Sequence, residues 1–264
     1  MGVSIPPRGK DFGPVAQLAR ALVWHTKGQG FESPQVHQMK VLIFGEKSKD
    51  IEKIVGKLGF KIVEDKPDLV LGYGGDGTMM LAESNFPGIP KIVLKKDGSI
   101  CKKCSLLDNK EVLKRIKNGD YEIEKLWKLK ASVAGKSLLG MNDIIIHNKD
   151  ARHAIRYRIW INDKEISSTI IGDGVVVATP FGSTAYYRSI TDSFFEVGMG
   201  LAFNNSTEQS DHIVLKENSK IKIKIIRGPV VIYADNQPEF VEAEEGDEIK
   251  IEKSNIVAKI LRIK

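Results

Sequence analysis

The chain has 264 residues, of which 42% are hydrophobic and 28% charged, and its formal net charge is +6. This composition excludes a disordered or collagen-like chain and suffices for one large domain or two modest ones. The basic residues are scattered along the chain, which argues against a nucleic-acid partner, and no apolar run of about 18 residues predicts a membrane-spanning helix.

Residues 1–38 differ from the rest of the chain, since they are rich in Gly, Pro, Gln and His around one short apolar stretch. The segment 15–34 resembles the product of translating a tRNA gene in a protein reading frame. We therefore expect residues 1–38 to be a non-native or disordered extension and Met39 to be the natural start.

Strands and helices alternate from Met39 to about residue 120. The apolar residues Ile51, Ile54, Val55 and Leu58 follow helical spacing after a capping residue, Ser48. We expect strands at 40–44, 60–63, 68–71 and 89–94, and helices after Ser48, through residues 79–81 and at 109–117. This alternation predicts an α/β domain with a parallel sheet over residues 39–120.

The pattern changes at Tyr121 to alternation of apolar and polar residues, separated by Gly, Pro, Asn and Asp turn signals. The strands expected from it are 121–129, 144–147, 155–161, 174–180, 220–226, 230–234, 247–252 and 256–263. The sequence thus predicts an all-β, sandwich-like domain over residues 121–264, with its last strands able to return to the first domain. A cleft between two such domains is the default ligand site.

Cys101 and Cys104 form one C-x-x-C pair. A disulfide framework needs more cysteines, and a zinc site needs a second pair or suitably spaced histidines. We expect an ordinary loop pair in a reducing, cytoplasmic compartment, with a redox or metal role as the alternative.

The strongest local signal is the glycine-rich segment 72–78, which follows a predicted strand and precedes a predicted helix. Glycines let backbone N–H groups approach phosphates, and a helix N-terminus favours anions. A carboxylate there, Asp76, suits a base for an attacking hydroxyl or a ligand of Mg²⁺. The alternatives are a turn with Asp76 as helix cap, or a G-x-G-x-x-G dinucleotide fingerprint paired with Asp97, as in dehydrogenases.

Two later segments also indicate a binding site. The pair Asn142-Asp143 precedes an apolar strand and suits a ribose and a base edge, or it is a turn entering that strand. The segment 173–189 runs from a buried strand into a Pro/Gly loop with backbone donors and hydroxyls, or it is a strand-to-helix connection. Ser183 does not fit a hydrolase nucleophile, because G-x-S-x-G is absent.

The three motifs together are more specific than any one of them. G-G-D-G-T at 74–78, the Asn142-Asp143 pair and D-G-x-x-x-x-T-P-x-G-S-T-A-Y-x-x-S from Asp173, in this order, resemble the NAD kinases, most closely those of archaea. The resemblance extends over residues 39–264, and residues 235–237 resemble the family's D-G-Q turn. Phe181 departs from the pattern, because it stands where the family has Thr or Ser, and the loop 95–101 replaces a G-x-N-x-G-x-x-G-F loop.

The resemblance implies a role for each matching residue. Asp76 would accept the proton of the 2′-hydroxyl of the adenosine ribose. The phosphates would be lined by Gly74, Gly75, Gly77 and Thr78, the ribose and base would be held by Asn142 and Asp143, and the nicotinamide end would face Asp173. The wall around the dinucleotide would be formed by Phe181, Thr184, Ala185, Tyr186 and Ser189, with a further contact from Gln237 near the end of the chain.

The resulting prediction is a cytoplasmic NAD kinase that uses ATP, another nucleoside triphosphate or polyphosphate, with Mg²⁺ or another divalent cation. The family resemblance also implies a homodimer or homotetramer, with no nucleic-acid or membrane partner. The alternatives are a lipid or sugar kinase that shares the glycine motif, a dinucleotide-binding dehydrogenase, and an NAD-binding module without catalysis.

Overall fold

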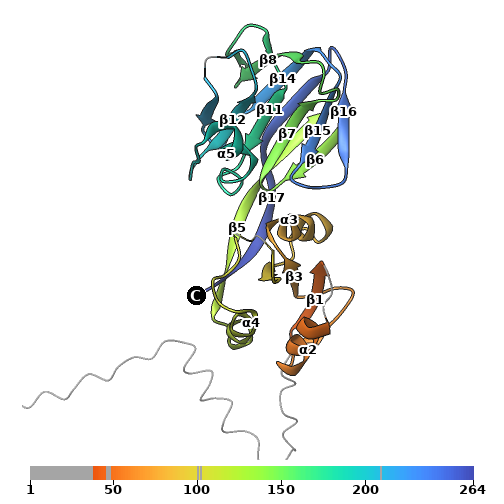
Figure 1. Ribbon diagram of the computed structural model, residues 1–264, viewed down its shortest axis with the longest axis vertical. Helices are drawn as coiled ribbons and strands as arrows, with labels where there is room; N and C mark the ends of the chain where they lie inside the picture. The colour runs from red at the N-terminus through yellow and green to blue at the C-terminus, as the bar shows by residue number, and fades with distance from the viewer. Residues whose placement is uncertain (1–37, 46–48, 100, 102, 209) are drawn as a thin grey trace, which may run out of the picture. The chain divides into compact units, whose positions relative to one another are not determined.

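The computed structural model describes residues 38–45, 49–99, 101, 103–208 and 210–264 (Figure 1). The residues of the expected extension, apart from Gln38, therefore lie outside the described part of the chain. The predicted capping residue Ser48 lies outside it as well. Residues 38–264 form one compact unit.

The first part of this unit alternates strands and helices in the predicted order. Its elements are β1 (Lys40–Gly45), α2 (Lys49–Lys57), β2 (Lys61–Ile62), β3 (Leu69–Gly74), α3 (Asp76–Asn85), β4 (Lys91–Lys95) and α4 (Asn109–Asn118). The four strands pair in parallel in the order β2-β1-β3-β4. Helix α4 begins where the side chain of Asp108 accepts the backbone N–H of Glu111 at 2.9 Å, and it ends at the left-handed Gly119.

The second part is built from antiparallel strands and one short helix. Its elements are β5 (Tyr121–Val133), β6 (Lys136–Gly140), β7 (Asp143–Asn148), β8 (Ile155–Ile161), β9 (Lys164–Glu165), β10 (Ile170–Gly172), β11 (Gly174–Ala178), α5 (Tyr186–Thr191), β12 (Met199–Asn204), β13 (His212–Leu215), β14 (Ile221–Arg227), β15 (Val230–Ala234), β16 (Phe240–Ala243) and β17 (Glu248–Ile263). Within the described residues they make one sheet in the order β13-β12-β11-β7-β15-β16, and a second sheet that contains β10-β8-β14-β17 and β5-β6.

Strand β17 joins the two parts into one continuous sheet. It pairs with β14 and β5 in the second part, and near its end Ile260 pairs in parallel with Lys91 of β4. Figure 1 shows β5 and β17 running together between the two regions. The prediction of separate strands at 247–252 and 256–263 is wrong, because the chain passes an irregularity between Lys253 and Val257 without turning.

Several strands were not predicted from the sequence. They are β6, β9, β10, β12, β13 and β16, each of six residues or fewer. In short strands the alternation of apolar and polar residues covers too few positions to be recognised. Strand β12 also contains Gly200, whose backbone packs closely against aromatic rings.

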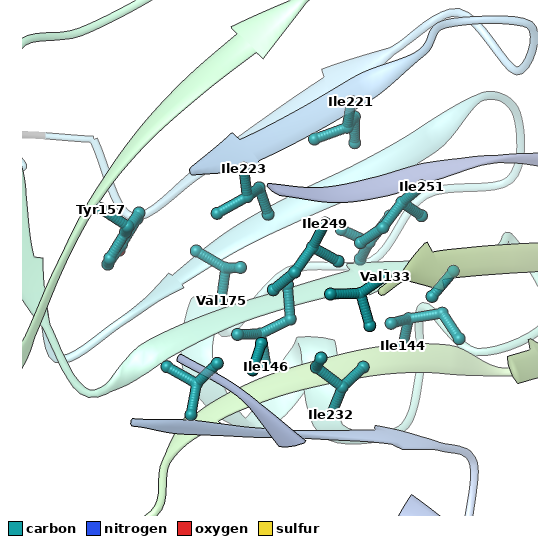
Figure 2. Packing of buried hydrophobic residues seen from close by; sticks show 14 of the residues in the cluster. Val133, Ile144, Ile146, Tyr157, Val175, Ile221, Ile223, Ile232, Ile249 and Ile251 are labelled. Atoms are coloured by element: carbon teal, nitrogen blue, oxygen red, sulfur yellow. The ribbon is translucent and has the colours of Figure 1, made fainter. Parts of the chain in front are cut away.

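The main core lies between the two sheets of the second part. Inward-facing isoleucines and valines of both sheets interdigitate there, and the residues labelled in Figure 2 are isoleucines and valines of this core together with Tyr157. The alternation read from the sequence is what supplies this layer, because every second residue of a strand faces the same side. A second cluster lies between the parallel sheet and helices α2 and α4. The predicted fold class, an α/β domain with a parallel sheet followed by a β-sandwich, is confirmed.

Two isoleucines of β17 test this account of the core. Ile251 is completely buried, whereas Ile256 is 47% exposed. We expect Ile251→Ala to lower the free energy of unfolding by about 2–5 kcal/mol, because it leaves a cavity between the sheets. The matched variant Ile256→Ala should cost less than about 1 kcal/mol. Urea unfolding of both variants measures the difference, and equal losses would contradict this placement of the core.

Candidate active site at the glycine loop

The glycine-rich segment forms the junction between β3 and α3. Strand β3 ends at Gly74, Gly75 caps the helix, and Asp76 is its first residue. The hydroxyl of Thr78 accepts the backbone N–H of Gly75 at 3.3 Å, and a Cβ at Gly74 would collide with that hydroxyl. The tight turn therefore needs Gly74, and it places the Asp76 carboxylate at the positive end of a helix.

The loop between β4 and α4 covers Asp76. The backbone N–H of Lys103 donates to Asp76 Oδ1 at 2.9 Å, and the Sγ atom of Cys101 lies 3.4 Å from the same oxygen. Cys101 and Cys104 form a disulfide, so the interpretation of the two cysteines as an ordinary loop pair is wrong. The two Cα atoms, three positions apart in the chain, lie 5.5 Å from each other, which permits the bridge.

The opposite wall is built around the Asn142-Asp143 pair. A single carboxylate, Asp235, accepts the backbone N–H groups of Met141, Asn142 and Asp143 at 2.7–3.1 Å. The loop after β11 packs directly on this segment, because a Cβ at Gly182 would overlap the carbonyl of Asn142. The geometry leaves Asn142 Oδ1 buried without a hydrogen-bond partner in the described structure, so it can accept a bond from a ligand.

A cavity of about 270 Å³ separates these walls. It is lined by Asp76, Met79, Met80, Lys103, Asn142, Phe181, Thr184 and Ala185. The structure therefore brings five of the residues singled out in the sequence to one hollow: Asp76, Asn142, Phe181, Thr184 and Ala185. The volume lies just below the usual range of ~300–1,000 Å³ for small-molecule sites, so the cavity has room for a small ligand or for part of a larger one.

The remaining residues of the glycine motif support the loop. Thr78 holds Gly75 as described, and the carbonyl of Gly77 accepts a bond from Asn236 Nδ2 at 3.2 Å. The Ser99 hydroxyl donates a hydrogen bond to the carbonyl of Gly74 at 2.8 Å. None of the three lines the cavity between Asp76 and Thr184.

Other singled-out residues lie around the cavity rather than on it. Asp143 is buried behind Asn142, Ser189 is exposed one turn into α5, and Gln237 donates to the carbonyl of Leu139 at 2.7 Å. Gln237 instead lines a larger neighbouring cavity of about 520 Å³.

Asp173 and Tyr186 belong to a separate polar group. Asp173 lies just before β11, at the end of that strand that is far from Asn142. Gly174, the first residue of β11, pairs with His147, whereas the last residue, Ala178, pairs with Asp143, the neighbour of Asn142. Asn205 donates to Asp173 Oδ2 at 2.9 Å. The hydroxyl of Tyr186 receives a bond from Asn204, the strand partner of Gly174, at 3.3 Å. Tyr186 thus connects α5 with the neighbourhood of Asp173.

The sequence reasoning missed Lys103 and did not foresee the role of Asp235. Lys103 Nζ donates to the carbonyl of Phe181 at 2.6 Å and to the hydroxyl of Thr184 at 3.3 Å, so it reaches across the cavity. No motif marked it, since it follows the loop 95–101, which departs from the family pattern, and belongs to none of the three matching motifs. In the sequence, Asp235 was identified only as part of the turn formed by residues 235–237.

Two carboxyl groups lie next to the cavity, Asp143 buried and Asp235 partly buried. Burial, and then the negative charge of Asp235, raise the pKa of the Asp143 carboxyl from 3.8 to about 7. Burial also raises the pKa of Asp235, although the three backbone N–H groups and the positive charge of Lys128 oppose that shift. Asp235 is thus the better stabilised anion of the two, and Asp143 is the one that takes up a proton.

The described residues contain no group of three His, Cys, Asp or Glu side chains that would hold a metal ion by themselves. Mg²⁺ is commonly held by one or two carboxylates together with substrate phosphates. Asp76 is the carboxylate that lines the cavity, so a site completed by phosphate oxygens fits this geometry.

None of the helices among the described residues combines the length and the apolar character that crossing a bilayer requires.

The comparisons with known proteins agree on the class of protein. The fold is that of two solved kinases of NAD and NADH. Yeast NADH kinase in complex with NADH has a TM-score of 0.74 at 19% identity, covering 86% of this chain and 84% of that one. An NAD kinase from Archaeoglobus fulgidus in complex with ATP has a TM-score of 0.69 at 19% identity, covering 85% and 94%.

The sequence comparisons give the family. Residues 141–263 match the model of the ATP-NAD kinase C-terminal domain. The NAD kinase of Sulfurisphaera tokodaii is 30% identical over 250 residues, which cover 85% of this chain and 95% of that protein. The chain belongs to the NAD kinase family, and the resemblance read from its motifs is confirmed.

The raised pKa of Asp143 predicts a pH dependence of stability. Between pH 4 and pH 7 the native protein retains a proton that the unfolded chain has released, so stability falls as pH rises through this window. The fall attributable to this group is at most about 4 kcal/mol. We expect Asp143→Asn to lose less stability than the wild type over this range, as measured by urea unfolding at several pH values.

The matched control is Asp120→Asn, which changes an exposed aspartate. Its stability should follow the wild-type pH profile. Parallel profiles for the wild type and Asp143→Asn would show that Asp143 does not retain its proton in the folded protein.

Proposed function

We propose that this chain is an NAD kinase that transfers a phosphoryl group from ATP to the 2′-hydroxyl of the adenosine ribose of NAD, giving NADP. The observation that carries the proposal is the Asp76 carboxylate at the N-terminus of α3, facing a cavity shared with Asn142 and Thr184. Membership of the NAD kinase family supports the reaction, and the relatives' names give its substrates.

In this mechanism Asp76 accepts the proton of the 2′-hydroxyl as its oxygen attacks the terminal phosphorus of the donor. Asn142 Oδ1, buried and without a partner in the described structure, suits a donor group such as the exocyclic amine of adenine. The Thr184 hydroxyl and the backbone at Ala185 complete the wall around the ribose. Catalysis then consists of positioning and of proton removal at one oxygen.

The phosphate donor and the metal are finer parts of the proposal. The Archaeoglobus structure is a complex with ATP, and we infer ATP as the donor here. Mg²⁺ would be held by Asp76 and the donor phosphates, and it would neutralise charge on the transferred group. Another nucleoside triphosphate or polyphosphate stays an alternative donor.

We place the nicotinamide half of NAD along the start of α5. Tyr186 follows Ala185 and receives a hydrogen bond from Asn204, whose carbonyl accepts the backbone N–H of Asp173 at 3.0 Å. Tyr186 would supply an aromatic face, Asp173 would accept bonds from the distal ribose or amide, and Ser189 would lie at the rim.

We further propose a homodimer or homotetramer located in the cytoplasm. Strands β13 and β16 are the edges of their sheet in the described structure, and an unpaired edge is suited to pairing with another subunit.

A matrix of acceptors and donors tests the proposed reaction. NAD, NADH, diacylglycerol and fructose 6-phosphate would each be incubated with labelled ATP, another nucleoside triphosphate or polyphosphate. We expect label in NADP, or in NADPH when NADH is the acceptor. Label only in lipid or sugar would favour the other kinases, and absorbance change at 340 nm without transfer would favour a dehydrogenase.

Substitution of the proposed base gives a sharper test. We expect Asp76→Asn to lower kcat by about 100-fold or more, because the amide does not accept the hydroxyl proton, while NAD binding is retained. Steady-state kinetics and calorimetric titration with NAD measure the two effects. Near-normal turnover of this variant would remove Asp76 from the role of base.

A further inference from the structure

Lys103 is the residue that contacts both walls of the cavity. Its backbone N–H donates to Asp76 Oδ1 at 2.9 Å, on the side of the glycine loop. Its ammonium group donates to the Phe181 carbonyl at 2.6 Å and to the Thr184 hydroxyl at 3.3 Å, on the opposite side. The same ammonium lies 4.1 Å from the centre of the Phe181 ring. A positive charge is thus held between the proposed base and the loop that lines the ribose.

The backbone of Lys103 is fixed from several directions. The Cys101–Cys104 disulfide brackets it, and both sulfur atoms pack against a buried cluster that includes Met79. The carbonyl of Lys103 accepts a bond from Arg262 Nη1 at 3.3 Å, while its N–H is held by Asp76. A lysine held in this way loses less conformational freedom when it meets a ligand, which is the condition for an effective catalytic charge.

We propose that Lys103 is a catalytic residue that binds the transferred phosphoryl group. This inference rests on the proposed function and adds a residue to its site. The Phe181 carbonyl oxygen and the Thr184 hydroxyl oxygen, which the ammonium contacts, are both neutral. A phosphoryl oxygen brought to the same cavity is charged and is a stronger acceptor. The ammonium therefore exchanges these contacts for the phosphate.

The step conserves atoms and charge without a further reactant. The 2′-oxygen forms a bond to the terminal phosphorus, and the bond from that phosphorus to the bridging oxygen breaks. The electron pair of the broken bond stays with the leaving nucleoside diphosphate, and the hydroxyl proton moves to Asp76. Lys103 keeps its protons throughout and stabilises the negative charge that spreads over the oxygens of the group in transit.

The loop offers other lysines, but they are placed differently. Lys95 is exposed at the end of β4, and the backbone N–H of Lys96 donates to the carbonyl of Gly74 at 3.2 Å. Among the described residues of this loop, Lys103 is the lysine that lines the cavity with Asp76.

The test compares Lys103→Met, which keeps most of the apolar stem, with Lys103→Arg, which keeps the charge. We expect Lys103→Met to lower kcat by about 100-fold, with NAD affinity changed less than about threefold, because one charged donor to the transition state is lost. Lys103→Arg should recover part of this loss. The matched control is Lys110→Met, an exposed lysine on α4, which should retain wild-type kinetics.

A binding measurement separates this role from a structural one. The probe is a β,γ-imido analogue of ATP with Mg²⁺, titrated into each variant by calorimetry. We expect Lys103→Met to bind the analogue about tenfold more weakly, with a melting temperature within a few degrees of the wild type. Unchanged kcat of Lys103→Met together with its unchanged affinity for the analogue would overturn the proposal. A loss of kcat that accompanies unfolding and that Lys103→Arg shares would overturn it as well.

The two proposals fail in distinguishable ways. A wild-type protein that transfers no phosphate to NAD contradicts the proposed function, whereas the analogue titration still decides whether Lys103 binds phosphate. A wild-type protein that is active, with a fully active Lys103→Met variant, contradicts only the role of Lys103.

Discussion

The site depends on one partly buried carboxylate, Asp235. It lies in the turn after β15, yet it accepts three successive backbone N–H groups from residues 141–143, more than ninety positions away in the chain. The next residue, Asn236, donates to the carbonyl of Gly77 in the glycine loop. A single turn therefore fixes the ligand-facing Asn142 and also contacts the segment that carries Asp76. A carboxylate is suited to this because it has several lone pairs for N–H donors that would otherwise be buried without partners.

The cost of burying Asp235 is offset by nearby positive charge. Lys128 of β5 contributes a favourable interaction with Asp235 and also forms an ion pair with Glu83 of α3, which in turn pairs with Lys91 of β4. All three members of this ion-pair group are almost completely buried. Burial lowers the pKa of Lys91, and the hydrogen bond to Glu83 opposes this shift. Charges of alternating sign thus connect the helix of the glycine loop, the parallel sheet and the long strand β5, which is how such ions are tolerated away from water.

The functional consequence is a cavity whose walls come from both parts of the chain. Asp76 comes from the first part and Asn142 from the second, and the loop with Cys101, Lys103 and Cys104 closes the space between them. The pairing of β17 with both β4 and β5 joins the two parts of the chain that supply these walls. Substrate and donor are therefore expected to meet at groups that the fold has already positioned, which is the main source of rate enhancement in phosphoryl transfer.

The sequence by itself determined the alternation of strands and helices in the first part, the change to β-structure after residue 120, and the motifs around Asp76, Asn142 and residues 173–189. Periodicity and glycine placement are local signals, and they act wherever the chain goes afterwards. Tertiary structure alone decided which of these residues share a cavity. It grouped Asp76 with Thr184, moved Asp173 to the far end of β11, joined two predicted strands into β17, and placed Lys103 across the cavity. These outcomes depend on strand register and on contacts between residues far apart in sequence, and no local pattern encodes such contacts.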